Sequence, residues 1–195
     1  MLNIQTQLFE SKDVRFGPID HEAHPEIESK WTHDAEFMRL MEHTPVRPLS
    51  PALVRKRYES IEKQMDEDKN MFYFTLRTRE DDRLIGKAVV EWIDWTNGNG
   101  FLRLGLGAAG DRRRGYGSQA LGMLLRYSFG EINLYRVSAV IPAYNEGALR
   151  LFQKFGFVEE VRRRKALNRD GQFWDSLSFG LLGSEWQEHQ TTGQG

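Results

Sequence analysis

The sequence predicts an α+β (mixed α/β) fold, in which helices cover both faces of a sheet. Three observations lead to this prediction. Strand-like and helix-like patterns interleave along the 195 residues. The run Asn97-Gly-Asn-Gly100, between two apolar runs, is a strong hairpin signal. Finally, residues 101–129 form an apolar run, a glycine-bearing turn and a helical pattern in succession. Such interleaving is typical of layered domains.

The first part of the chain combines one short strand with helices. Residues 14–19 are predicted to form the strand, and residues 25–32 and 34–41 two helical pieces, with Asp34 as a candidate N-cap. Three prolines mark the following loop. The last of them, Pro51, suits the first turn of a helix that runs to about Met65.

Apolar periodicity predicts the remaining elements. Alternation predicts strands around residues 72–76 and 173–181, and Asp81-Asp82 marks a turn before a longer strand over 84–95. Further strands are expected over 101–108 and 136–141. Two helical faces are Ala120, Leu121, Leu124, Leu125, Ser128 and Phe129, and then Ala148, Phe152 and Phe155. We expect residues 1–195 to form a single domain whose last residues, 183–195, are a flexible tail.

Composition limits the classes of function. The chain contains no cysteine, which excludes disulfides and thiolate chemistry and suits a cytoplasmic location. Its start lacks the features of a signal peptide, and no run approaches the ~20 apolar residues of a membrane span. We therefore expect no membrane partner. Four of the five histidines, at positions 21, 24, 33 and 43, lie in the first part of the chain but lack a convincing ligand spacing, so no metal is expected.

Charge is distributed unevenly, although the net charge is only −1. Residues 1–70 carry 10 basic and 14 acidic side chains, whereas residues 101–170 carry 13 basic and 6 acidic ones. The basic part favours an anionic ligand. The acidic part favours an amine-bearing substrate, or is ordinary surface charge. Nucleic acid is not expected as a partner, because the chain as a whole is not basic and the run Arg162-Arg-Arg-Lys165 would alternate sides on a strand.

The turn Arg112-Arg-Arg-Gly-Tyr-Gly117 has the properties of a phosphate site. The first amides of a helix have no intrahelical acceptor, and the helix dipole adds partial positive charge at this end. Glycines let the backbone approach a phosphate closely, and guanidinium groups pair well with its oxygens. The overlapping run Gly105-Leu-Gly-Ala-Ala-Gly110 fits a dinucleotide fingerprint, but the helix begins too late after it for that fold.

Three ordered motifs resemble those of GNAT-type N-acetyltransferases. The first is Arg112-x-x-Gly115-x-Gly117, and the second is Asn145-Glu-Gly-Ala-Leu-Arg-Leu-Phe-Gln-Lys-Phe-Gly-Phe157. The third, Asn168-Arg-Asp-Gly-Gln-Phe-Trp-Asp175, is similar to a hairpin of the branch that acetylates the N-termini of ribosomal proteins. The resemblance covers roughly residues 84–182. It implies a central, mostly antiparallel sheet that is splayed in the middle.

The resemblance also implies a cosubstrate, acetyl-CoA, and the residues that bind it. The cosubstrate would lie between the strands at 101–108 and 136–141, with its pyrophosphate on the amides of the glycine turn. The residues implied in binding are Leu104, Leu106, Arg112, Arg113, Arg114, Gly115, Tyr116, Gly117, Ser118, Asn145 and Phe152. Asn145 is equally suited to cap the helix that follows it.

The catalytic groups depart from the family pattern at two positions. Phe152 occupies the position of the tyrosine that usually acts as general acid in the family. Arg103 occupies a position on the motif strand where the family often has a glutamate. Glu91 is the candidate base, directly or through water, with Asp94 as an alternative; each could instead be a solvent-facing strand carboxylate. Tyr144 and Asn145 are expected near the thioester, and Tyr144 or Ser138 could donate a proton.

The acceptor is expected to be a primary amine, most readily a protein or peptide N-terminus by similarity to the ribosomal branch. Trp31, Asp34 and Trp92 are the predicted acceptor-side residues. The alternatives are a small amine (a polyamine, an aminoglycoside or an amino acid) and a non-catalytic domain that binds acyl-CoA. We expect a monomer or a homodimer.

Overall fold

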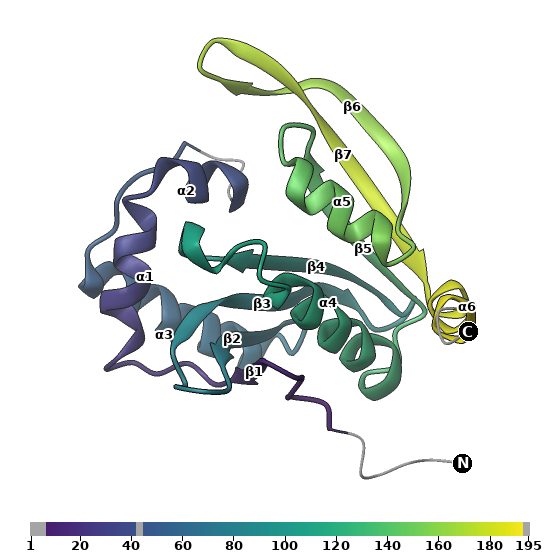
Figure 1. The fold of residues 1–195 in the computed structure, drawn as a ribbon, viewed down its shortest axis with the longest axis horizontal. Coiled ribbons are helices and arrows are strands. Elements are labelled where there is room, and N and C mark those ends of the chain that lie inside the picture. Colours follow the sequence, from purple (N-terminus) through teal and green to yellow (C-terminus); the bar gives the residue numbers. More distant parts are fainter. Residues whose placement is uncertain (1–6, 42–44, 193–195) are drawn as a thin grey trace.

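The structure, a computed structural model, describes residues 7–41 and 45–192. Its centre is a seven-stranded sheet in the order β1-β2-β3-β4-β5-β7-β6. Helices lie on both faces of this sheet (Figure 1). β4 and β5 are parallel, and the other neighbouring strands are antiparallel. The predicted α and β fold with a mostly antiparallel sheet is therefore confirmed.

The observed elements follow the predicted order with small shifts at their ends. The strands are β1 (Val14–Gly17), β2 (Phe72–Thr78), β3 (Leu84–Asp94), β4 (Asn99–Leu106), β5 (Arg136–Pro142), β6 (Val158–Arg169) and β7 (Gln172–Leu182). The helices are α1 (His24–Thr32), α2 (Ala35–Met41), α3 (Pro51–Glu67), α4 (Tyr116–Arg126), α5 (Glu146–Lys154) and α6 (Gly183–Thr192). Asp34 caps α2 as predicted, because its Oδ1 accepts hydrogen bonds from the amides of Glu36 and Phe37.

Strand alternation divides the apolar residues between the two faces of the sheet. On one face, α4 packs against residues such as Leu76, Val90 and Leu102 in the main core. On the other face, α3 packs Val54 and Tyr58 against neighbouring positions of β2 and β3. The predicted face of α4 is confirmed, since Ala120, Leu121, Leu124 and Leu125 are fully buried. Burial of each such leucine contributes about 1.5–3 kcal/mol.

A buried polar cluster fastens α1 to the second face. Glu28 of α1 accepts hydrogen bonds from Lys87 Nζ at 2.8 Å and from the Tyr58 hydroxyl at 2.7 Å. Burial acts to raise the pKa of the Glu28 carboxyl, but the attraction of Lys87 and these hydrogen bonds outweigh it and leave that pKa lowered. The cluster therefore fixes the helix from which α2 continues.

Most of the segment predicted to be a flexible tail forms a helix, and residues 193–195 of that prediction lie outside the described residues. The residues from Gly183 to Thr192 form α6, and Trp186 of this helix is buried. The indole stacks on Phe155, which follows α5, with 6.0 Å between ring centroids. A single tryptophan in an otherwise polar segment thus provides the apolar anchor for this helix.

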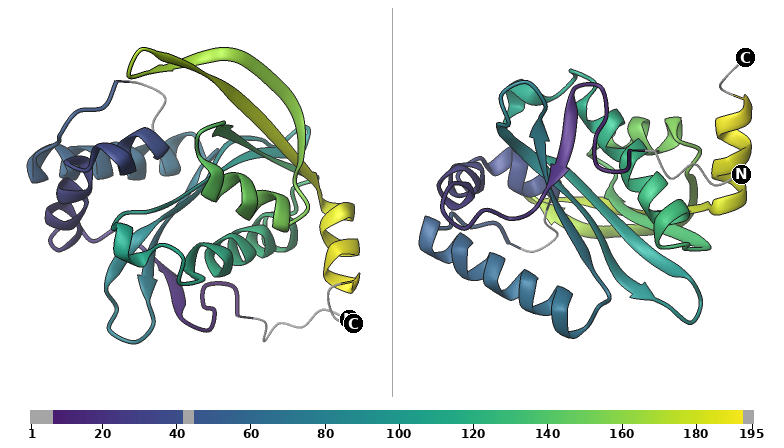
Figure 2. Two further views of the ribbon diagram at one scale, coloured as in Figure 1. Left: turned by 45° about the horizontal axis from the view of Figure 1, so that its top comes forward. Right: turned by 90° about the horizontal axis from the view of Figure 1, so that it is seen from below.

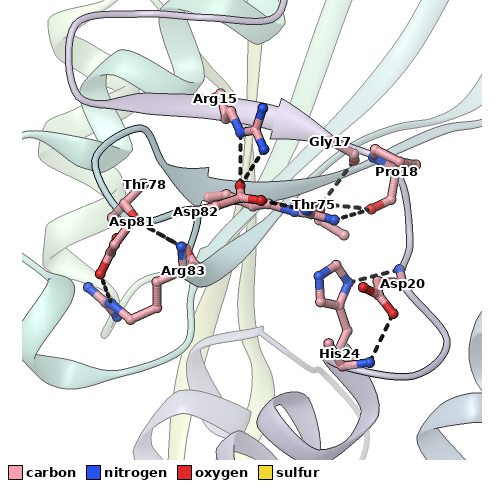
Figure 3. A network of polar contacts seen from close by, with 12 residues as sticks. Arg15, Gly17, Pro18, Asp20, His24, Thr75, Thr78, Asp81, Asp82 and Arg83 are labelled. Carbon is pink, nitrogen blue, oxygen red and sulfur yellow. Dashed lines mark hydrogen bonds and ion pairs between the residues drawn. The ribbon is translucent and has the colours of Figure 1, made fainter.

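The turn between β2 and β3 is held by a polar network (Figure 3). Asp82 accepts hydrogen bonds from Arg15 of β1 and from Arg77 of β2. The Thr78 hydroxyl donates to Asp81 and its oxygen accepts from the amide of Arg83. The turn that Asp81-Asp82 predicts is therefore present, and it fixes the start of β3.

β6 and β7 form a long hairpin that extends past the rest of the sheet towards α2 (Figures 1 and 2). Register shifts after Glu159 and after Arg163 mark bulges in β6, and bulges bend a strand. The two turn residues, Asp170 and Gly171, both have positive φ (52° and 74°), as a type I′ turn requires. This geometry carries the hairpin tip over to the N-terminal helices.

Candidate functional site

The sheet opens between β4 and β5. These strands pair only where Asn99, Gly100 and Phe101 face Arg136, Val137 and Ser138, although β4 continues to Leu106 and β5 to Pro142. The divergence leaves a cavity of about 580 Å³. It is lined by β4, by the segment ahead of α4 and the start of α4, by α5 and by α2. The predicted splay is confirmed.

The segment that leads to α4 is anchored at its beginning. Asp111, which is buried, accepts one hydrogen bond on each carboxylate oxygen from the guanidinium of Arg83, at 2.7 and 2.8 Å. These hydrogen bonds raise the pKa of Arg83. A bidentate pair of this kind is among the stronger polar contacts in proteins. It ties residues 112–118 to the fixed turn between β2 and β3.

Glycine is required where this segment turns into α4. Gly115 is the residue before the helix and has φ of +83°, a conformation that other residues adopt at a cost. The next amides, in the first turn of α4, have no acceptor within the helix. Gly117 lines the cavity, and a Cβ placed on it would lie 3.6 Å from the nearest atom of Leu151. Amides and the helix dipole thus converge on an anion site.

Arg112 adds a charged donor to this site. Its Nη1 donates to Glu36 Oε1 at 2.6 Å, whereas its Nη2 is buried and has no hydrogen-bond partner among the described residues. Arg112 lines the cavity, and 22% of its side chain is exposed. A buried donor without a partner is costly. An anionic ligand in the cavity would satisfy it.

The opposite wall comes from the start of α5 and the residue before it. Asn145 caps α5, because its Oδ1 accepts a hydrogen bond from the Ala148 amide at 3.1 Å, and it also lines the cavity. Tyr144 lines the cavity too, and its hydroxyl donates to the Arg39 carbonyl of α2 at 2.8 Å. Phe152 is buried and packs against Phe157.

A second cavity of about 410 Å³ adjoins the first. The two share Glu36, Leu40 and Tyr144, so these side chains border both spaces. The second cavity lies between α2 and the β6–β7 tip, where Arg39 and Asp170 form an ion pair at 2.8 Å. Its remaining lining residues are Arg169, Gln172 and Trp174. The motif at 168–175 predicted this hairpin, but no pattern in the sequence indicated that the hairpin contacts α2.

Most of the predicted cofactor residues meet at the first cavity. Those that line it are Leu104, Leu106, Arg112, Arg113, Gly115, Gly117, Ser118, Asn145 and Phe152. Arg114 and Tyr116 lie outside the lining. The Arg114 guanidinium instead stacks over the Tyr116 ring, 5.3 Å from its centroid, and Tyr116 packs against the main core.

The carboxylates considered as bases have different surroundings. Glu91 is buried and its Oε1 lies 3.4 Å from Arg103 Nε, so the alternative of a solvent-facing carboxylate is wrong for this residue. Glu91 lines neither cavity, but it pairs across the sheet with Phe101, where the splay begins. Asp94 is exposed and accepts hydrogen bonds from Asn97 and Thr96 at the hairpin turn, which lower its pKa.

The three predicted acceptor residues lie outside the linings of both cavities. Trp31 is buried and packs on β4, while Asp34 caps α2. Trp92 is 61% exposed, has φ of +52° at a bulge of β3 and contacts Phe101. Of the three, Trp31 and Asp34 position α1 and α2, and through them the wall that α2 contributes.

The glycines of the rejected dinucleotide pattern have a packing role. A Cβ on Gly107 would lie 2.0 Å from the ring of Trp31, and a Cβ on Gly105 would lie 2.3 Å from Met41 Sδ. Gly110, by contrast, has nothing within 4 Å of such a Cβ. Gly105 and Gly107 are therefore explained by the close packing of α2 and α1 against this part of the chain, and no bound nucleotide is needed to explain them.

Among the described residues, no group of three or more histidine and carboxylate side chains has an arrangement that could hold a metal ion. Nor does any described helix combine the length and apolarity that crossing a membrane requires.

Comparison with known proteins agrees with this geometry. The family model for the acetyltransferase (GNAT) domain matches residues 13–158. An uncharacterised N-acetyltransferase, YokL, from an SPbeta prophage of Bacillus subtilis is 25% identical over 79% of this chain and 82% of its own. A putative ribosomal N-acetyltransferase of the same organism, YdaF, is 33% identical over 33% of this chain and 35% of its own. The fold also matches a spermidine N-acetyltransferase from Vibrio cholerae, solved with CoA and spermine, with a TM-score of 0.75 and 17% identity over 89% of this chain and 98% of that one.

Proposed function

The chain belongs to the acetyltransferase (GNAT) family, and from this premise we propose that it acetylates the N-terminal amine of a peptide or protein. It is an acetyl-CoA-dependent N-acetyltransferase. What has to be inferred is the acceptor and the residues that serve it. We assign the cofactor to the larger of the two adjoining cavities and the acceptor to the smaller one.

Acetyl-CoA, when bound, supplies an acetyl thioester that a neutral amine attacks. We assign its pyrophosphate to the first amides of α4 and to Arg112, whose Nη2 has no other partner among the described residues. Leu104 and Leu106 of β4 would border the pantetheine arm, because the β4 edge is open beyond Phe101. Asn145 would face the thioester end of that arm.

The acceptor proposal rests on one observation about charge. Both carboxylates that line the second cavity are paired with arginines, Glu36 with Arg112 and Asp170 with Arg39. A polycationic acceptor would have to compete with these arginines, whereas a peptide carries a single terminal amine and its backbone can hydrogen-bond to Gln172 or Tyr144. The partial similarity to a putative ribosomal N-acetyltransferase supports the same choice.

Proton transfer is assigned to two side chains. Glu91 would accept the amine proton directly or through water, since it lies level with the start of the splay. The Tyr144 hydroxyl would donate a proton to the departing sulfur, in place of the tyrosine that is Phe152 here. To do so it must exchange its present acceptor, the Arg39 carbonyl.

A small amine is the second candidate. The specific observation in its favour is the fold match to an enzyme solved with spermine, together with the acidic balance of residues 1–70. In that case the acceptor ammonium would displace Arg39 or Arg112 from its carboxylate.

A panel of acceptors distinguishes the candidates. We would measure thiol release from acetyl-CoA with short peptides, the same peptides blocked at the N-terminus, spermidine, and free amino acids. We expect turnover with free peptide N-termini and none with their blocked forms. Higher kcat/KM with spermidine would reject the peptide proposal. Tight acetyl-CoA binding without any turnover would favour a non-catalytic domain.

A further inference from the structure

The short helix α2 lies between the two cavities and contacts both. Glu36 and Leu40 line both spaces. Glu36 reaches Arg112 of the phosphate site, and Arg39, about one turn further along the helix, reaches Asp170 at the hairpin tip. No other described helix contributes side chains to both linings.

Arg112 has the capacity to serve two partners at once. A guanidinium presents five donors in a planar fork. Here Nη1 binds Glu36, and Nη2 is the buried donor that lacks a partner. A phosphate bound through Nη2 would therefore fix the guanidinium without removing it from Glu36. Bound phosphate would in this way restrain α2.

The ion pairs of α2 are weak enough to respond to such a restraint. The side chains of Glu36 and Asp170 are 67% and 70% exposed, and exposed ion pairs contribute little to stability. The apolar side of this seven-residue helix is anchored, because Phe37 and Met38 are buried in a core cluster. The restraint therefore acts on the polar side of α2 and, through Arg39, on the hairpin tip.

We propose that Glu36 is a positioning residue that couples the cofactor to the acceptor pocket. Phosphate on Arg112 fixes Glu36 and α2, and α2 then fixes Asp170 through Arg39, which completes the wall of the second cavity. The inference rests on the acceptor pocket proposed above. Because coupling between two binding sites is reciprocal, the acceptor also tightens CoA binding by the same factor. The coupling passes through the two exposed ion pairs in turn, so the weaker pair limits this factor to roughly 5-fold.

The absence of cysteine allows a test that needs no acceptor. Phe173 lies beside the hairpin tip, is 61% exposed and lines neither cavity, so Phe173→Cys gives a single thiol for an environment-sensitive fluorophore. Titration with CoA should change the emission of the labelled protein. In Glu36→Gln and in Asp170→Asn the emission change should be lost, while calorimetry shows CoA affinity within about 10-fold of the parent.

Glu146→Gln is the matched control. Glu146 is also an exposed carboxylate of the first cavity, but it pairs with Arg150 of its own helix. This variant should keep the emission change. The coupling is wrong if Glu36→Gln responds as the parent does, if the parent binds CoA without any response, or if Glu36→Gln loses CoA affinity by far more than 10-fold. Failure of the parent to bind CoA would instead reject the proposed function.

Discussion

The two cavities differ in how they are built. The cofactor side depends mainly on backbone: a left-handed Gly115, the first amides of α4 and the open edge of β4. The acceptor side depends on long side chains from α2 and the hairpin tip, joined by an ion pair between residues 131 positions apart. The phosphate-binding part of the cofactor side is therefore formed by contiguous sequence, from β4 to α4, whereas the acceptor side forms only when distant elements meet.

This difference has energetic consequences. Backbone donors in a helical turn are fixed by folding itself and keep their geometry when surface side chains change. Exposed ion pairs contribute little individually and weaken with salt. We expect substitutions on the cofactor side to act through shape, and substitutions on the acceptor side to act through charge and to be reversible by exchanging the charges.

The largest effect is expected at Gly117. Gly117→Val places a branched side chain in the cavity, beside the amides assigned to the pyrophosphate, and should weaken CoA binding at least ~100-fold, or about 2.7 kcal/mol. Calorimetric titration with CoA measures this change. The melting temperature should stay close to that of the parent, since a Cβ at Gly117 meets nothing nearer than 3.6 Å.

Gly110→Val is the control for that substitution. Gly110 belongs to the dinucleotide-like pattern, and a Cβ there meets nothing within 4 Å. Its CoA affinity should equal that of the parent. If Gly117→Val binds CoA normally and Gly110→Val does not, the phosphate lies at the earlier glycines and the cofactor side has been misassigned.

The next largest effect tests the proton acceptor. Glu91→Gln keeps the size of the side chain next to Arg103 and should lower kcat about 100-fold if Glu91 is the general base, with CoA affinity unchanged. Initial rates of thiol release with the best peptide of the panel give kcat. Asp94→Gln is the comparison, because Asp94 is exposed at the hairpin turn and is expected to leave kcat near that of the parent. Full activity of Glu91→Gln would remove Glu91 from the mechanism.

The success of the sequence-based predictions also differs between the cofactor side and the acceptor side. Periodicity, the Asn97–Gly100 hairpin and the glycine turn are local signals, and they predicted the order of strands and helices. The splay was implied by the family resemblance, and most of the residues that it implied for the cofactor line the first cavity. The predicted acceptor-side tryptophans line neither cavity: Trp31 fills the space above Gly107, and Trp92 lies on an exposed bulge.

The missed residues have no local signal. Arg39 and Glu36 are ordinary polar residues of a short helix, and only the bend of β6 brings Asp170 and Trp174 next to them. The helix at the C-terminus was missed for a similar reason, because its anchors are tertiary contacts such as those of Trp186 with the main core and of His189 with the Lys154 carbonyl. Tertiary contacts, rather than periodicity, decide these positions.

A smaller effect is expected at the ion pair of the acceptor side. Arg39→Asp should raise the KM for the acceptor up to about 10-fold and leave the CoA affinity measured without acceptor within 2-fold, since only the hairpin contact is lost. The exchange Arg39→Asp with Asp170→Arg should recover most of the loss. Initial rates at 50 and 300 mM salt check the cause, because the difference from the parent should shrink at high salt. No recovery in the exchanged variant would show that Arg39 acts directly on the acceptor.

The smallest effect concerns how the two sides respond to acid. His24 begins α1, and its Nδ1 accepts the Asp20 amide at 3.0 Å, so the ring is neutral there (Figure 3). Burial lowers the pKa of His24, helped by Arg77, while Asp20, Glu28 and Asp82 oppose the shift. The unfolded chain therefore binds this proton more readily than the folded one.

It follows that the free energy of unfolding falls as the pH drops through about 6.5 and below, by at most ~1.4 kcal/mol per pH unit for one proton. Urea titrations between pH 7.5 and 5.5 should show this slope, and His24→Gln should flatten it. The same change at His33, exposed at the other end of α1, should not. The Arg83–Asp111 pair, rather than α1, anchors the phosphate-binding segment, so CoA affinity should hold while α1 and α2 loosen. An equal slope in the parent and in His24→Gln would place the acid sensitivity outside α1 and remove this distinction between the two sides.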